Sequence, residues 1–539
     1  MIAADSVPDT QYSTIYKELF ESSDPRFVKD DEPLILDAMN PHHYQTFADL
    51  KRKVRSLAIS LRREPFNLQE GDVVLVCIPE DVESATVMYG VTCAGCAACY
   101  VEVGAHLDEI QGVFDSMSPK AVIVHPDSLS TIAAAWDDDK RDIPVLSMGT
   151  KAQSLKGTSL LLLRDYIQDH VEECLPSVDP ETPALLLQTS GSTGTPKRVN
   201  LTQRTIAARI RNETDIQRSL LNGDTNPRML SFYQCGFGPW FSVSFICIRL
   251  GVPLYAMNFL AGFSNLNLVL SKVQEFGITL IYTLKSQSLY DIAYQPEVNA
   301  YNYDLSILRL VCTRGQPIPR DTLLRAGASL KAMMVNFFAS TETGVVLAHY
   351  STKQPYYEKI GMHAYANSMA NIKVVDKKGQ EASPGVEAEL LVQGPMNAAG
   401  YYNRPDLTAK AFDKEGYYHT SDKFIVDQES NYINLGRETD AIKTKDGNVC
   451  FDGIKQCIAV GVLNTKSTDE NPHMYIVPTQ GAIFDHDKVS QLIAYINERV
   501  TKETLHGDSV TVLKELPHSN SFKVDRKKLR QMANNEINN

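Results

Sequence analysis

The stretch ALLLQTSGSTGTPKRVNLT, residues 184–202, joins a strand pattern to a glycine-rich turn. Its apolar start predicts a buried β-strand that runs directly into hydroxyl residues and glycines, and a lysine closes the segment. Glycines let the backbone turn sharply and present consecutive N–H groups, and the hydroxyls add donors. We therefore expect a phosphate-binding loop made by Thr189, Ser190, Gly191, Ser192, Thr193, Gly194 and Lys197.

This loop differs from the Walker loop of many nucleoside triphosphatases. In the Walker loop the lysine follows a glycine directly and precedes a serine or threonine. Here Thr195 and Pro196 separate Gly194 from Lys197, and Arg198 follows the lysine. The stretch therefore indicates a phosphate loop of another class.

Helical and strand patterns alternate on both sides of the loop. An amphipathic helix at 48–64 precedes an apolar run at 72–80, and this order predicts βαβ units with a largely parallel sheet. Near residue 370 the pattern changes to strand, turn, strand, which indicates a small antiparallel β unit. Further strands are expected at 120–126, 278–284, 308–315, 332–340 and 474–479, and a helix at 487–500.

Length and composition limit the class of protein. The 539 residues suggest three or four packed units at about 150 residues per unit. The net charge of −12 opposes binding to nucleic acid, and no stretch reaches the roughly 18 apolar residues of a transmembrane segment. Ten cysteines without an export signal favour reduced thiols. We expect a cytoplasmic protein with no transmembrane segment and no nucleic-acid partner.

The loop resembles the signature T-S-G-[ST]-T-G-x-P-K-G of the adenylate-forming superfamily, which includes acyl-CoA synthetases, 4-coumarate–CoA ligases, luciferases and the adenylation domains of peptide synthetases. Further family motifs follow in the same order, so the resemblance covers essentially the whole chain. YDLSILRLVCTRGQPIP, residues 303–319, is similar to the strand and turn that lie along adenine and ribose. The resemblance assigns this turn to Gly315, Gln316 and Pro317.

The stretch NFFASTETG, residues 336–344, resembles the family motif N-x-Y-G-x-T-E. The resemblance implies that Phe338 stacks on adenine, that Thr341 lies at the phosphates, and that Glu342 binds the Mg²⁺ of ATP. An aromatic face suits a purine, and a carboxylate oxygen suits magnesium. Ala339 and Ser340 are expected beside the nucleotide.

Motifs nearer the C-terminus complete the resemblance. The stretch 387–412 is similar to the family's G-E-x4-G-x5-G-Y-x3-P-x2-T, and GYYHTSDKFIVD, 416–427, to its T-G-D block. They imply that Asp422 accepts hydrogen bonds from the ribose hydroxyls, and that Arg437 contacts ribose or phosphate.

Two lysines match those of the family's two half-reactions. Lys523, in LPHSNSFKVDRKKL (516–529), matches the lysine that offsets charge between carboxylate and α-phosphate. Lys443 matches the lysine of the thioester-forming step. One extra residue precedes Gly447, and Thr439 stands at the hinge where Asp or Lys is usual.

Other positions also depart from the family pattern. Glycines of the family motifs are replaced by Arg198, Ala339, Ala388, Ser421 and Phe522. The ion-carrying residues that the resemblance assigns to the nucleotide are nevertheless all present, which favours an active enzyme over a non-catalytic homologue.

The segment 229–251 lines the acid pocket by resemblance and contains no Asp or Glu. An unpaired ammonium group is costly in an apolar pocket, so we expect an acid without an amine, of fatty or aryl type. Tyr233, Phe237 and Trp240 are candidate contacts, with ordinary core packing as the alternative.

Together these features predict an α/β protein. Residues 1–435 would form a large N-terminal region of two α/β subdomains plus a small β unit, and residues 436–539 a small mobile α+β domain. The resemblance implies that ATP, Mg²⁺ and CoA serve to convert a small-molecule carboxylic acid to acyl-AMP and then to a thioester. A phosphopantetheinyl carrier as acceptor, a luciferase-like oxygenase and a non-catalytic nucleotide-binding protein stay open as alternatives.

Overall fold

The computed structural model describes most of the chain. The described residues are 13–22, 27–136, 142–151, 154–168, 173–189, 197–221, 223–295, 298, 300–315, 318, 320–350, 361–364, 369–437, 454–463, 470–478, 482–498, 505–506, 509–517 and 524–538.

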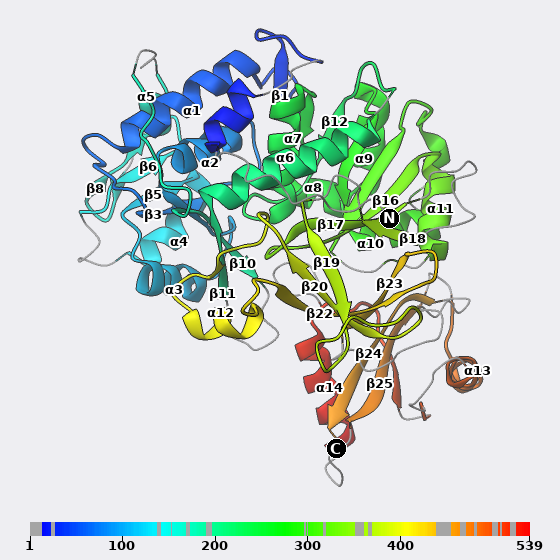
Figure 1. Ribbon diagram of the computed structural model, residues 1–539. Helices are drawn as coiled ribbons and strands as arrows, with labels where there is room; N and C mark the ends of the chain where they lie inside the picture. Colours follow the sequence, from blue (N-terminus) through cyan, green and yellow to red (C-terminus); the bar gives the residue numbers. More distant parts are fainter. Residues whose placement is uncertain are drawn as a thin grey trace.

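The larger sheet has 13 strands within the described residues (Figure 1). Its strands run parallel from β1 to β16 and antiparallel beyond β16. In spatial order they are β19 (Asn371–Val375), β20 (Ala388–Gln393), β22 (Tyr418–Val426), β23 (Tyr432–Arg437), β18 (Gly361–Ala364), β17 (Gly344–Tyr350), β16 (Met333–Ser340), β15 (Leu310–Arg314), β14 (Leu280–Leu284), β12 (Met229–Ser231), β13 (Leu254–Ala256), β1 (Pro33–Asp37) and β2 (Tyr44–Thr46).

The second sheet contains the strands on either side of the expected phosphate loop. Its strands are parallel from β10 to β9, whereas β11 and β21 are antiparallel to their neighbours. In spatial order they are β21 (Gly400–Tyr401), β11 (Lys197–Thr202), β10 (Pro183–Thr189), β4 (Ala97–Tyr100), β3 (Val73–Cys77), β5 (Ala121–Val124), β6 (Val145–Ser147) and β9 (Leu161–Leu162). A separate hairpin joins β7 (Ser154–Leu155) to β8 (Thr158–Ser159).

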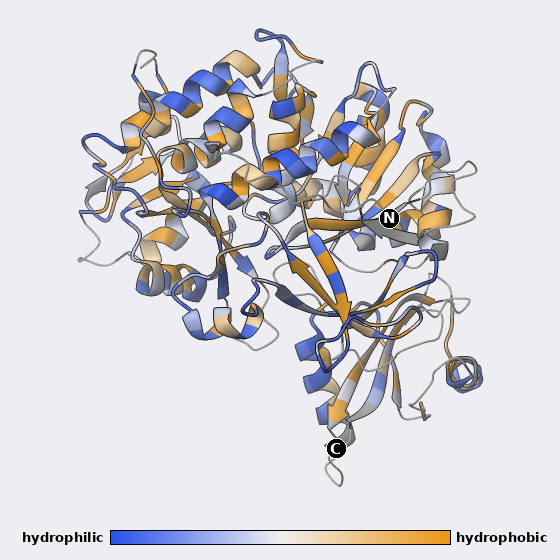
Figure 2. Cartoon of the chain, in the orientation of Figure 1, coloured by the Kyte–Doolittle hydropathy of each residue, from blue (hydrophilic) through white to orange (hydrophobic). Residues whose placement is uncertain are grey.

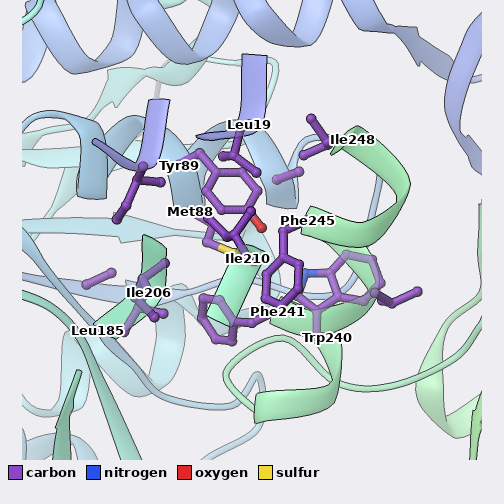
Figure 3. Close-up of a cluster of buried hydrophobic side chains, with 14 of the residues drawn as sticks. Leu19, Met88, Tyr89, Leu185, Ile206, Ile210, Trp240, Phe241, Phe245 and Ile248 are labelled. Atoms are coloured by element: carbon purple, nitrogen blue, oxygen red, sulfur yellow. The ribbon is translucent and has the colours of Figure 1, made fainter. Parts of the chain in front are cut away.

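Four helices share one hydrophobic core with both sheets. Figure 3 shows part of this core, where Met88 and Tyr89 from one helix meet Ile206 and Phe241 from two others. Parallel sheets need apolar cover on both faces, and these helices provide it on the faces that the sheets share. The helices are α1 (Phe47–Leu61), α2 (Ser84–Cys93), α6 (Gln203–Leu220) and α7 (Gly238–Leu250).

Other helices cover the remaining faces. Figure 2 shows hydrophobic residues concentrated in the strands, whereas α1 and α6 alternate hydrophobic and hydrophilic positions. One group of helices packs on the second sheet through a cluster that includes Phe114, and another packs on the larger sheet through a cluster that includes Leu289. Two short helical segments, η1 (Lys17–Glu21) and α5 (Leu163–Tyr166), also contribute residues to the shared core. The other helices and helical turns are α3 (Leu107–Met117), α4 (Leu129–Ala134), α8 (Phe259–Ser264), α9 (Leu266–Phe276), α10 (Ser286–Tyr294), α11 (Arg320–Leu330), α12 (Pro405–Ala411), η2 (Pro126–Ser128) and η4 (Ala300–Asn302).

The C-terminal part has a sheet of its own. Strands β24 (Ile454–Leu463), β25 (Glu470–Pro478) and β26 (Val510–Val512) pair with one another, with α13 (His486–Asn497) and α14 (Arg526–Asn538) packed against them. Strand β23 stays in the larger sheet as far as Arg437, and the next described residue is Ile454. The division into units at 435/436, and the mobility of the second unit, stay predictions.

The predicted α/β class is confirmed, with one difference in the β unit. The helix expected at 48–64 is α1, and the strands expected around the phosphate loop are β10 and its parallel neighbours. The strands after residue 370 are antiparallel as predicted, but they extend the larger sheet through β23 and β18 instead of forming a sheet of their own. Within the described residues, no helix is long and apolar enough to cross a membrane.

The contact between α1 and α2 depends on Gly90. A Cβ atom at Gly90 would lie 2.5 Å from Leu57 Cδ2 and 2.9 Å from Leu57 Cβ, so this close approach requires glycine. We expect Gly90→Ala to lower the free energy of unfolding by about 1–3 kcal/mol through overpacking. Thermal unfolding checks this, with Gly112→Ala at an exposed position of α3 as control, because a Cβ there meets no atom within 4 Å. Equal midpoints for the two variants would contradict the prediction.

Candidate active site

The two ends of the expected phosphate loop lie side by side. Thr189 ends β10 and Lys197 begins β11, and the two residues are partners in the antiparallel register. The Thr189 hydroxyl donates to the Lys197 carbonyl at 3.5 Å. The residues between them, Ser190, Gly191, Ser192, Thr193, Gly194, Thr195 and Pro196, lie outside the described residues. The structure therefore gives the base of the loop.

A chain of hydrogen bonds starts at this base. Lys197 Nζ donates to the Tyr401 hydroxyl at 3.0 Å, and that hydroxyl donates to Glu342 Oε1 at 2.9 Å. The Lys197 ammonium also lies 4.1 Å from the centre of the Tyr401 ring. Lysine, tyrosine and glutamate come from three distant parts of the sequence and meet at one point.

Glu342 lies in the turn between β16 and β17, and its backbone is held on both sides. Its carbonyl accepts a hydrogen bond from the Ala398 N–H at 2.7 Å. The preceding carbonyl, of Thr341, accepts from Arg209 Nη2 at 2.9 Å. Arg209 Nε donates at 2.9 Å to the carbonyl of Met396. Glu342 is only 7% exposed, so the surrounding atoms restrict its side chain.

Arg209, on α6, places a buried positive charge beside this carboxylate. Burial lowers the pKa of its guanidinium to about 10, and the charges of Glu213 and Glu342 oppose that shift. A pKa near 10 keeps Arg209 protonated at neutral pH. Its charge therefore offsets part of the cost of burying Glu342.

Phe338 and its neighbours lie at the end of β16, on the strand that leads to Glu342. The Phe338 ring packs edge-on against Phe424 of β22, with ring centres 5.1 Å apart. Ala339 follows it, and the Ser340 hydroxyl lies 3.0 Å from that of Thr343. This contact between Ser340 and Thr343 closes the turn that contains Thr341 and Glu342.

Asp422 lies on β22, two residues before Phe424. It is half-buried, its N–H donates to Thr420 Oγ1 at 3.0 Å, and its register partner is Arg437 of β23. Ser421 has φ of +60°, a left-handed conformation that glycine adopts more easily than serine. This geometry explains why glycine is usual at that position, and Glu389 Oε1 accepts the Ser421 N–H at 2.9 Å.

Arg198, which replaces the glycine after the loop lysine, lies inside the second sheet. Its side chain is 6% exposed and donates to the Tyr100 carbonyl at 2.9 Å and to Gln188 Oε1 at 3.2 Å. The arginine therefore ties β11 to β10 and to the end of β4. Its guanidinium is therefore hydrogen-bonded to groups of the second sheet.

Several predicted nucleotide contacts are only partly placed. Gly315 directly follows β15, with φ of +104°. Arg437 is the last residue of β23, and its backbone pairs with that of Asp422. The position of its side chain lies outside what the structure describes. Gln316, Pro317, Lys443 and Lys523 lie outside the described residues, so their roles stay predictions.

The three candidate acid contacts separate into two groups. Trp240 is fully buried in the shared core, beside Phe241 and Phe245 (Figure 3). Its burial agrees with the alternative of ordinary core packing, and its role as an acid contact stays a prediction. Tyr233 and Phe237 are partly buried, and their rings meet edge-on with centres 6.5 Å apart.

Sequence reasoning missed a charged cluster beside Tyr233. Arg314, at the end of β15, bonds the Tyr282 hydroxyl and, at 3.2 Å, Ser242 Oγ, and lies 3.9 Å from Glu213. Burial raises the pKa of Tyr233 to about 12, and the Arg314 charge opposes that rise. An arginine inside the apolar run LRLVCTRG was the signal for this cluster.

A carboxylate also reaches the segment 229–251 from elsewhere in the chain. Gln234 Nε2 donates to Glu102, which follows β4, at 3.3 Å. Burial and the nearby charge of Glu109 raise the pKa of Glu102 to about 7, and Lys285 opposes the rise. The Lys285 ammonium lies 5.3 Å from the Tyr233 ring. The region is therefore more polar than its own segment indicates.

A family model described as AMP-binding enzyme matches residues 26–402, well over half of the sequence. The chain belongs to the AMP-binding enzymes. This match contains Lys197, Glu342 and Tyr401, so the hydrogen-bonded group lies within the family's characteristic region. The resemblance to the adenylate-forming superfamily is thereby confirmed, and with it an acid-activating, ATP-dependent type of ligase.

Curated relatives of this AMP-binding enzyme are CoA ligases. The 4-coumarate–CoA ligase 4 of Arabidopsis thaliana is 25% identical over 517 residues, covering 90% of this chain and 85% of the relative. The long-chain-fatty-acid–CoA ligase of Escherichia coli O157:H7 is 24% identical over 575 residues, covering 99% and 96%. Among solved structures, the anthranilate CoA ligase AuaEII with anthranoyl-AMP matches with a TM-score of 0.80 at 16% identity, covering 98% of each chain. That match shows the fold.

The raised pKa of Glu102 predicts a pH-dependent stability. Between its ordinary pKa near 4.5 and its folded pKa of about 7, the folded protein binds more protons than the unfolded chain. The stability from this group is full below the ordinary pKa and is lost as the pH rises through about 7. We expect the unfolding midpoint to fall less between pH 5.5 and 7.5 in Glu102→Gln than in the wild type. Exposed Glu32→Gln is the control, and a Glu102→Gln profile parallel to the wild type would refute the assignment.

Proposed function

We propose that this AMP-binding enzyme converts a carboxylic acid and ATP to acyl-AMP and pyrophosphate, and then transfers the acyl group to CoA. The observation that carries the proposal is the hydrogen-bonded chain of Lys197, Tyr401 and Glu342 at the base of the phosphate loop. It brings a cation and a carboxylate together where the loop would deliver the phosphates of ATP.

The proposed residues would supply the groups that adenylation needs. An oxygen of the acid attacks the α-phosphorus, the bond to the bridging oxygen breaks, and pyrophosphate leaves with that electron pair. Lys197 offers a positive charge for the phosphates, and in the proposal Lys523 offsets charge between the acid and the α-phosphate. Asp422 and Arg437 would hold the ribose, and Phe338 would meet the adenine.

Glu342 is suited to hold magnesium. Tyr401 contacts Oε1, and no hydrogen bond from the described residues reaches Oε2. A hard carboxylate oxygen with this freedom fits the ligand preference of Mg²⁺. When bound, the metal would neutralise charge on the phosphates.

The acid is proposed to be of fatty or aryl type, in contact with Tyr233 and Phe237. The names of the two curated relatives, one for 4-coumarate and one for long-chain fatty acids, support these two classes. A phosphopantetheinyl carrier is the alternative thiol acceptor. The expected cytoplasmic location stays a prediction.

Pyrophosphate release over a panel of fatty and aryl acids, with and without CoA, tests the proposal. No acid-dependent release with any member of the panel would overturn it.

The first half-reaction depends on Lys523 in this proposal. We expect Lys523→Ala to keep ATP binding in calorimetry but to slow acid-dependent pyrophosphate release by about 10²–10³-fold, since it removes a charge that acts in the transition state. Lys527→Ala, an exposed position on α14, is the matched control and should keep wild-type rates. Near-normal release by Lys523→Ala would remove this lysine from the mechanism.

The second half-reaction depends on Lys443. Because the resemblance assigns the nucleotide contacts to other residues, we expect Lys443→Ala to release pyrophosphate normally but to form less acyl-CoA from pre-made acyl-AMP. Single-turnover measurements of each step separate the two effects. Equal losses in both steps, or none in either, would rule out this role. A wild type that makes acyl-AMP but no acyl-CoA would favour the carrier as acceptor.

A further inference from the structure

Tyr401 occupies a position that the assigned roles leave unexplained. It is 5% exposed and lies in β21, at the edge of the second sheet next to β11, where it is the register partner of Val199. Its hydroxyl is the only described group that bonds both Lys197 and Glu342. The tyrosine therefore links the last residue of the phosphate loop to the carboxylate proposed for magnesium.

The chemistry of the partners fixes the direction of both hydrogen bonds. A lysine ammonium has donors and no acceptor, and an ionised carboxylate has acceptors and no donor. The tyrosine hydroxyl must therefore accept from Lys197 and donate its single proton to Glu342. Both bonds involve a charged partner, which makes them stronger than bonds between neutral groups.

The backbone of Tyr401 is fixed independently of its hydroxyl. Its N–H donates to Thr408 Oγ1 at 2.9 Å, and the Thr408 hydroxyl donates to the Arg404 carbonyl at 3.0 Å. At Gly400, φ is +130° and a Cβ would lie 2.4 Å from Thr408 Cγ2, so the chain passes this threonine in a way that requires glycine. The ring therefore reaches the site from a rigid support.

We infer that Tyr401 is a positioning residue that couples magnesium binding at Glu342 to nucleotide binding at Lys197. The inference rests on the proposed function. By holding Oε1, the hydroxyl would fix the Glu342 carboxylate so that Oε2 stays available to the metal. By accepting from Lys197, it would hold the ammonium in place until the phosphates of ATP replaced it as the partner of the lysine. Tyr401 acts through these two residues and does not itself touch the reacting atoms.

The test compares Tyr401→Phe with Tyr402→Phe. Tyr401→Phe removes one oxygen atom and keeps the ring. Tyr402, which directly follows β21, is the matched control, because its side chain packs against the hydrophobic cluster that includes Phe114 and not toward Glu342. The measured quantity is ATP affinity by calorimetry at zero and saturating Mg²⁺, expressed as the ratio of the two. We expect this ratio to fall about tenfold in Tyr401→Phe, as for loss of one charged hydrogen bond, and to stay at the wild-type value in Tyr402→Phe.

The outcomes separate the inference from the proposed function. If the wild type binds Mg·ATP and Tyr401→Phe keeps the wild-type ratio, the inference is wrong and the proposed function stands. If the wild type binds no ATP, both fall. Thermal unfolding checks that the variant is folded. Should it unfold, Lys197→Met decides, because this variant removes the cation at the other end of the chain. It lowers the ratio if the two sites are coupled, and an equal loss of affinity with and without Mg²⁺ would overturn the inference.

Discussion

A buried guanidinium holds the parts of the site together. Arg209 projects from α6, within the core that both sheets share, and donates to the carbonyls of Thr341 and Met396. An uncompensated charge at this depth would cost several kcal/mol, so the two carbonyls and the nearby carboxylates are a requirement of the fold. Gly344 meets the same requirement, because a Cβ there would lie 3.2 Å from Arg209 Nε.

Most of the fold could be predicted from the sequence because its signals are local. The run ALLLQT became β10, and the amphipathic pattern after residue 47 became α1, capped by Thr46. The join between the β unit and the larger sheet was not predictable. The join depends on the pairing of β23 with β18, two segments about seventy residues apart. The residue pattern of neither segment indicates its partner.

Site residues that belong to a sequence motif could be predicted. Residues that approach the site only through the tertiary structure could not. Glu342 and Lys197 stand in recognisable stretches, and the structure places them at the two ends of one hydrogen-bonded chain. Glu102 and Arg314 follow or end other strands and approach residues 229–251 from there. The composition of that segment alone could therefore not indicate them. Trp240 is fully buried, as in the alternative of core packing, and its role as an acid contact stays a prediction.

The hydrogen-bonded chain also crosses a mechanical boundary. Lys197 and Tyr401 belong to the second sheet, whereas Glu342 lies in a turn of the larger one. A small slip of one sheet against the other would separate the hydroxyl from the carboxylate while each sheet kept its own backbone hydrogen bonds. Nucleotide binding therefore depends on the contact between the two sheets. It should be lost in a partly opened state in which each sheet keeps its strands, even though spectroscopy would still detect the native secondary structure.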